Sequence, residues 1–257
     1  MTTLADCVQH LDTALQTAEV PDYDGAVNGL QLQNSGTVAR VATAVDFSIH
    51  TVQGAVDAGA QLLLVHHGMF WGGAQSLVAH RYHRLKLAID SGLAVYSSHL
   101  PLDLHPTLGN NRLLAKAMGL QPDGGFGRYH GIEIGVCGQC EIATMDLFAK
   151  VRGFVEPLGS TLVTTPVDAS RRTRTWAVLT GAGASSETLH EALVRGIDTL
   201  VVGEGPHHTA VEAAELGIAV AYAGHYATET LGVQALAQEL ERTFSLPWTF
   251  IHRPTGL

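Results

Sequence analysis

A short apolar run at residues 61–65 is followed at once by two histidines, His66 and His67. An unbroken apolar run is typical of a strand that is buried on both faces of a parallel sheet. A second apolar run, residues 41–47, lies upstream, and a helical pattern over residues 49–58 connects the two runs and stops at Gly59. This order of strand, helix and strand predicts an α/β fold.

The same alternation continues along the chain. Further strands are expected at residues 93–97, 175–180, 199–202 and 218–223, and helices at residues 81–91, 110–118, 186–195, 209–216 and 228–243. Residues 121–127, which contain three glycines and a proline, indicate a domain boundary. We therefore predict two similar α/β domains with helix-flanked mixed sheets, residues 1–127 and 128–257, with the last helix able to pack back on the first domain.

The two halves resemble each other in sequence. Residues 59–65 align with 196–202, and residues 93–99 align with 218–225 with one residue of slack. The segments 93–99 and 218–225 each end in a histidine, and a carboxylate follows four residues later: Asp103 after His99, and Glu229 after His225. Duplication of one ancestral unit explains these matches, and chance similarity of short segments is the alternative.

Histidine is unusually frequent, with 14 residues, and several histidines follow predicted strands. Ligands of parallel α/β sheets bind beyond the carboxyl ends of the strands, and neutral imidazole is a common metal ligand. His66 and His67 can face one site only if the strand ends there and the chain turns, which Gly68 permits. One of them could instead be a hydrogen-bonded structural histidine.

The two histidine–carboxylate pairs are expected in different settings. Pro101 lies between His99 and Asp103, so we expect a loop there, in which Asp103 could also act as a turn or cap residue. His225 and Glu229 are spaced to share one face of the start of the last helix, although a surface contact has the same spacing.

Five or six nitrogen and oxygen donors exceed the three protein ligands of a typical catalytic zinc site. They suit two ions about 3.5 to 4 Å apart, with Glu229 as the bridging carboxylate. The donor set leaves iron, zinc, manganese, nickel and cobalt open.

Composition limits the classes of partner. The net charge of −9 argues against nucleic acid, and no apolar stretch approaches the roughly 20 residues of a membrane helix. The first 16 residues lack the pattern of a signal peptide, so a cytoplasmic protein is expected. Cys137 and Cys140 have the spacing of half a zinc site or a redox pair, or they are two small apolar residues of a strand over residues 132–140.

Several motifs resemble the NIF-three-like dinuclear metal centre family, whose bacterial members are catalogued as GTP cyclohydrolase 1 type 2 proteins. The match includes Asn28-Gly-Leu-Gln31, Leu62-Leu-Leu-Val-His-His67 with Phe70-Trp71, His99-Leu-Pro-Leu-Asp103 with Gly109-Asn-Asn111, Gly203-Glu204 with His208, and Gly224-His-Tyr-Ala-Thr-Glu229. Gly68 stands where the family usually has proline. The resemblance covers nearly the whole chain.

This resemblance implies two domains of similar topology with the metals in the cleft between them. The implied ligands are His66, His67, Asp103, His225 and Glu229, with His99 beside them. It also implies a homo-oligomer, a ring-shaped hexamer, without the inserted domain of longer relatives.

Two functions use the same ligands. The first is a metal-dependent hydrolase acting on a small molecule such as a nucleotide, by GTP cyclohydrolase-like or phosphoester chemistry, with His99 or His208 transferring protons. The second is a non-catalytic metal store, carrier or regulatory scaffold. A ring that encloses a macromolecule is a third reading, which the net charge disfavours for DNA.

Overall fold

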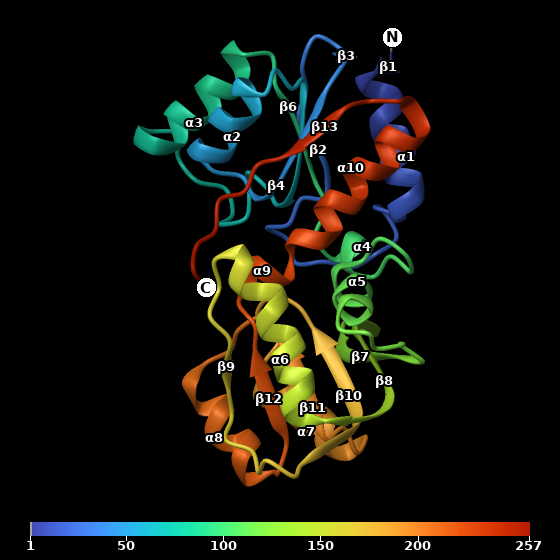
Figure 1. Cartoon of the computed structure of the whole chain (residues 1–257). Coiled ribbons are helices and arrows are strands. Elements are labelled where there is room, and N and C mark those ends of the chain that lie inside the picture. The colour runs from blue at the N-terminus through green and yellow to red at the C-terminus, as the bar shows by residue number, and fades with distance from the viewer. Residues whose placement is uncertain (1) are drawn as a thin grey trace. The chain divides into compact units, whose positions relative to one another are not determined.

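The computed structural model describes residues 2–257, which form two compact units (Figure 1). The first unit contains the chain up to His105 and Gly232–Arg253, and the second contains Pro106–Leu231 and Pro254–Leu257. The boundary therefore follows His105, whereas residues 121–127 were expected to form it. The glycines there belong to β7 (Gly124–Tyr129) and the segment before it, and β7 pairs along β8 (Ile132–Ala143) inside the second unit.

The first unit contains a five-stranded sheet in the order β13-β4-β5-β6-β2. Its strands are β2 (Gly29–Leu32), β4 (Val41–Asp46), β5 (Leu62–His67), β6 (Ala94–Ser97) and β13 (Trp248–Phe250). All neighbours are parallel except β2, which runs antiparallel along β6. Every residue of β5 is buried, as the unbroken apolar run predicts.

Helices cover both faces of this sheet. On one face α2 (Ile49–Asp57) and α3 (Ala79–Asp90) pack together, and their Val52 and Ala88 join Leu63 and Val65 of β5 in one apolar core. On the other face lie α1 (Leu4–Leu15) and the last helix, α10 (Thr230–Phe244). The Thr43 hydroxyl of β4 donates to the Val233 carbonyl of α10 at 3.0 Å. A two-stranded ribbon of β1 (Thr2–Thr3) and β3 (Thr37–Val38) lies next to α1.

The second unit contains a six-stranded sheet in the order β7-β8-β10-β11-β12-β9. Its remaining strands are β9 (Val163–Thr164), β10 (Arg172–Leu179), β11 (Thr199–Val202) and β12 (Ala219–Tyr222). The strands β10, β11 and β12 are parallel, and β7, β8 and β9 join as antiparallel neighbours. Both sheets are therefore mixed, as expected.

Alternating side chains of β10 separate the two cores of the second unit. Trp176 and Val178 face a core that contains residues of α5 (Asn110–Ala117) and α6 (Thr144–Val155), with a 3-10 turn, η1 (Glu156–Leu158), after α6. Ala177 and Leu179 face a core that contains residues of α7 (Ser186–Val194) and α8 (His207–Glu215). This is the period of two expected of a strand buried on both sides.

Four strands of each sheet follow the same order. In the first unit β4, β5 and β6 are parallel, α2 and α3 connect them, and antiparallel β2 closes the edge next to β6. In the second unit β10, β11 and β12 are parallel, α7 and α8 connect them, and antiparallel β9 closes the edge next to β12. The prediction of two similar α/β domains is confirmed.

One local prediction was wrong. The loop expected between His99 and Asp103 is a short helix, α4 (Leu100–Asp103), with Pro101 in its first turn. Proline is tolerated there because the first amides of a helix have no partner within the helix. A short helix, α9 (His225–Thr228), occupies the corresponding position of the second unit, after β12.

The cysteine pair of β8 does not form one site. Cys137 packs into the core beneath α7 and α8, whereas Cys140 packs against the core of the opposite face. Their thiols donate to the carbonyls of Gly125 and Thr173 respectively, and burial raises the pKa of both. Cys137 and Cys140 are therefore two small apolar residues of a strand, which was the second of the two interpretations of their spacing.

We predict that replacing both Cys137 and Cys140 with alanine leaves the metal content unchanged. Loss of one buried and one partly buried sulfur atom should lower the free energy of unfolding by about 2 kcal/mol in total. Urea unfolding and elemental analysis of the same preparation measure the two effects. A fall in bound metal would show that a thiol contributes to the site.

Candidate metal centre

Three histidines of the first unit lie at the carboxyl edge of its sheet. His66 and His67 end β5, and His99 follows β6. The ring centroids lie 4.8 Å apart for His66 and His67, 4.9 Å for His66 and His99, and 5.9 Å for His67 and His99. One nitrogen of each ring lies within 4.8 Å of the others, close enough for all three to bind one ion.

The expectation that β5 must end before both histidines can share a site was wrong. The strand continues through His67, which pairs with Asp46 of β4, and Gly68 is not among the glycines with positive φ. Pairing with β6 stops one step earlier, at Val65 and Ser97. The two histidines therefore extend past the end of β6, and both rings lie close to the His99 ring.

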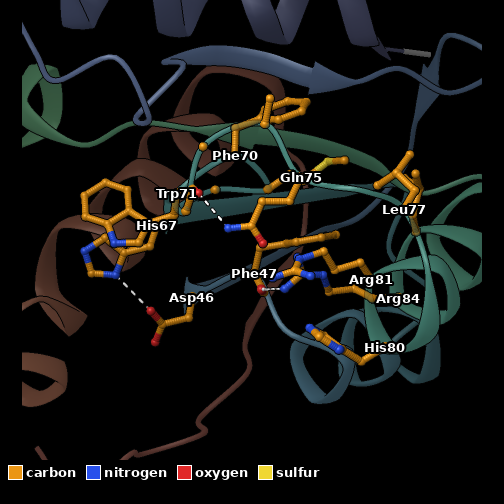
Figure 2. A pocket seen from close by; sticks show the side chains of 16 residues that line it. Asp46, Phe47, His67, Phe70, Trp71, Gln75, Leu77, His80, Arg81 and Arg84 are labelled. Carbon is orange, nitrogen blue, oxygen red and sulfur yellow. Dashed lines mark hydrogen bonds and ion pairs between the residues drawn. The ribbon is translucent and has the colours of Figure 1, made fainter.

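Hydrogen bonds fix the rings of His66 and His67. The Nδ1 atom of His66 lies 2.9 Å from the carbonyl oxygen of Ser98. The Nδ1 atom of His67 lies 2.8 Å from Oδ1 of Asp46, the contact that Figure 2 shows. A carbonyl and a carboxylate only accept hydrogen bonds, so both Nδ1 atoms carry the proton. The Nε2 atom then presents the lone pair that binds a metal.

His99 is held in the same way by a carboxylate that the sequence did not single out. Its Nδ1 atom lies 2.8 Å from Oδ1 of Asp22, and its backbone amide donates to the side chain of Asn28. Asp22 also accepts from the Asn28 side chain and the Leu100 amide. Burial opposes ionisation of Asp22, but its bonds with His99, Asn28 and Leu100 outweigh it and lower its pKa.

Asp103 adds a carboxylate to this group. It ends α4 and is 8% exposed, and its Oδ2 atom lies 3.6 Å from Nε2 of His66. An oxygen at that position can bind the same ion as the imidazole nitrogen. The structure therefore brings together four of the predicted residues: His66, His67, His99 and Asp103.

The second unit brings together His225 and Glu229, as their spacing predicts. The Nε2 atom of His225 lies 3.1 Å from Oε2 of Glu229, and its Nδ1 atom lies 2.7 Å from Oε1 of Glu204. Burial opposes protonation of His225, but Glu229 and Glu204 outweigh it and raise its pKa to about 9. Glu229 is 2% exposed, so its carboxylate is held away from bulk water.

Gly181 leaves space for the Glu229 carboxylate. It follows β10 with a φ of +65°, and a Cβ built on it would clash with Oε1 of Glu229 and lie 3.3 Å from Nε2 of His225. The strand-to-helix turn that begins at Gly181 is therefore packed against the two candidate ligands.

His208, a candidate for proton transfer, lies elsewhere. His207 and His208 begin α8 and are exposed. Hydrogen bonds with its own amide and with Ser185 lower the pKa of Glu187, and the nearby His208 adds to this shift. Among the described residues it has no hydrogen bond or ion pair with His225 or Glu229. The structure gives it no link to the metal ligands of its own unit.

The donor set fits a transition metal. Four imidazoles have Nδ1 bonded to an acceptor, so each would bind an ion through Nε2, and two buried carboxylates accompany them. At His225 the ion would replace the proton that Nε2 shares with Glu229. Nitrogen and oxygen donors of this kind suit zinc, iron, manganese, cobalt and nickel. None of the free cysteines belongs to either group.

The sequence profile of Duf34/NIF3 (NGG1p interacting factor 3) matches residues 2–255. The chain belongs to this family. A Deinococcus radiodurans protein named GTP cyclohydrolase 1 type 2 homolog is 37% identical over 254 residues, covering 98% of this chain and 94% of the relative. A Halobacterium salinarum protein of the same name is 41% identical over 241 residues, covering 93% of this chain and 94% of the relative.

Solved structures of the family share the fold of this chain. A protein titled ybgI, of unknown function, superimposes with a TM-score of 0.89 at 30% identity and covers all of both chains. TTHA1606 from Thermus thermophilus superimposes with a TM-score of 0.80 at 33% identity, again over all of both chains. No helix in the described part of the chain has the length and apolar character required to cross a membrane.

Substitution of Gly181 tests whether the Glu229 carboxylate binds metal. The Gly181→Ala change should displace that carboxylate and lower the affinity for metal about tenfold or more. The positive φ should also cost about 1 kcal/mol of folding stability. Metal affinity is measured by competition with a chromophoric chelator.

Gly196→Ala is the matched control. Gly196 has a φ of +66°, but no atom lies within 4 Å of a Cβ built there. It should lose similar stability and keep full metal affinity. Equal affinities of the two variants would contradict a role for Glu229 in metal binding.

Proposed function

We propose that this protein binds two divalent transition-metal ions through His66, His67, Asp103, His225 and Glu229. The observation that carries the proposal is a repeated pairing of histidine with a carboxylate. Asp46 holds Nδ1 of His67, Asp22 holds Nδ1 of His99, and Glu204 holds Nδ1 of His225. Such pairs orient metal-binding histidines and raise their basicity.

The crowding of the rings in the first unit supports the same proposal. His66 and His67 are 0% and 7% exposed, and each polar ring loses hydration when it is buried. An ion bound by several Nε2 atoms offsets that cost. Together the donors of both units number six with His99, more than one zinc ion takes from a protein.

We propose further that the bound metals serve hydrolysis. A pair of such ions supplies a nucleophilic hydroxide at neutral pH and stabilises developing negative charge. His99, oriented by Asp22, is positioned to bind an ion or to move a proton at its Nε2 atom. The name of the relatives, GTP cyclohydrolase 1 type 2 homolog, makes a nucleotide opened at its imidazole ring a candidate substrate.

Storage or transport of metal is the second candidate function. It needs the same ligands but no oriented proton-transfer group. The Asp22–His99 pair fits both functions, because a carboxylate that fixes the tautomer of a histidine is typical of acid–base catalysis as well as of metal binding.

Elemental analysis of protein purified without added metal tests the metal proposal. Wild type should hold close to two ions per chain. The first-unit variant His66→Ala/His67→Ala and the second-unit variant Glu229→Gln should each hold fewer than one, because the proposed pair of ions needs the ligands of both groups. His50→Gln, on an exposed position of α2, is the control that should keep both ions.

Two results would contradict this proposal. Equally low metal contents of wild type and the His66→Ala/His67→Ala variant would exclude the site. Loss of one ion in each variant with the other ion retained would indicate two independent mononuclear sites.

The Asp22→Asn variant separates catalysis from storage. Asparagine at this position allows the other tautomer of His99, so turnover should fall about 10-fold to 100-fold while at least one ion stays bound. Metal-dependent hydrolysis is measured over a panel that includes GTP and phosphate monoesters. Absence of metal-dependent turnover on every substrate by the loaded wild type would exclude the hydrolase and leave storage or transport.

A further inference from the structure

A pocket of about 400 Å³ opens beside His67 in the first unit. Its walls come from the ends of β4 and β5, from the segment after β5 and from the first half of α3 (Figure 2). Asp46 and His67 form one side, and Arg81 and Arg84 lie on another. A ligand in this pocket would therefore reach from a candidate metal ligand to two guanidinium groups.

The two arginines are close together and lack carboxylate partners. Arg81 and Arg84 are three residues apart on α3, a spacing at which side chains are neighbours on a helix surface. Arg84 donates to the Phe47 carbonyl at 2.8 Å and lies over the Phe47 ring. Burial and the charge of Arg81 both lower the pKa of Arg84. Among the described residues neither arginine has an ion pair.

The chain has 24 acidic and 15 basic residues, so carboxylates outnumber cationic side chains. Arg172 and Arg174 of β10, for comparison, both form ion pairs with Glu141. Two like charges at helical spacing destabilise a helix unless an anion lies between them. The first half of α3 therefore has two positive charges that a bound oxyanion would neutralise.

The rest of the pocket offers aromatic surface. Phe47, Phe70 and Trp71 line it, and Phe70 is 37% exposed. The Trp71 ring lies 4.3 Å from the His67 ring, and its backbone carbonyl accepts a hydrogen bond from Tyr23. Flat apolar side chains beside paired guanidiniums suit a ligand with both an aromatic ring and an anionic group.

We propose that this pocket binds a phosphate monoester that carries an aromatic ring. The phosphate lies at Arg81 and Arg84, and the ring contacts Phe70 and Trp71. Asp46, on the His67 side, repels the dianion and so fixes its direction in the pocket. Binding at the arginines is independent of the proposed function. A further step, that the bound ligand is also the substrate, rests on the proposed function.

Calorimetric titration with phenyl phosphate tests the proposal, with inorganic phosphate and benzoate as comparison ligands. The protein is used as purified and after removal of metal with a chelator. In both forms phenyl phosphate should bind more tightly than inorganic phosphate or benzoate. Arg81→Gln should weaken its binding about tenfold or more, the effect of losing one charge-assisted hydrogen bond.

The control is Arg174→Gln, which removes an arginine with a carboxylate partner in the other unit. It should leave the affinity for phenyl phosphate unchanged. Arg84→Lys, which keeps the charge, should bind more weakly than wild type but more tightly than Arg84→Gln. Thermal unfolding should show each variant folded.

Three results would overturn the proposal. Equal affinities of wild type and Arg81→Gln would exclude the arginines, and binding that disappears with the metal would place the oxyanion on the ions instead. Benzoate binding as tightly as phenyl phosphate would exclude a phosphate-specific site. If wild type holds no metal when purified but still binds phenyl phosphate through Arg81, the pocket proposal stands and the metal proposal is wrong.

Discussion

The hydrogen bond between a carboxylate and Nδ1 of a histidine is the interaction on which the candidate centre depends, and sheet register sets it. Parallel pairing places Asp46 of β4 opposite His67 of β5, and the pairing of Val65 with Ser97 brings the Ser98 carbonyl beside His66. A slip of one residue would turn each of these side chains to the opposite face. The buried strands that fix the register therefore also fix the imidazole tautomers.

Sequence reasoning located the central parallel strands of both sheets and most of the donors, because both produce local patterns. The unbroken run before His66 predicted β5, and the spacing of His225 and Glu229 matched a contact of 3.1 Å. The error at Pro101 had a physical cause, since proline penalises a helix interior but is tolerated in the first turn, where α4 has it.

The carboxylates that orient the histidines could not be found in the same way. Asp46 is an acidic residue at a strand end, a common feature, and only its register with His67 identifies its partner. Asp22 lies 77 residues from His99 in a segment without helical or strand periodicity. Contacts of this kind arise from tertiary structure, and one chain without related sequences has no local signal for them.

Because four strands follow the same order in both sheets, the residues after β5 and β11 can be compared, and they show why the two units contribute different side chains to the candidate metal centre. In the alignment of β5 with β11, Gly203 and Glu204 occupy the places of His66 and His67. His67 is a candidate ligand in the first unit, whereas Glu204, at the same place in the second unit, is the carboxylate that orients His225. A Cβ on Gly203 would clash with the carbonyl oxygen of Gly181 and lie 2.7 Å from its amide nitrogen. No imidazole fits at position 203 while Gly181 keeps the turn that makes room for Glu229, so the second unit cannot have a counterpart of His66 at this place.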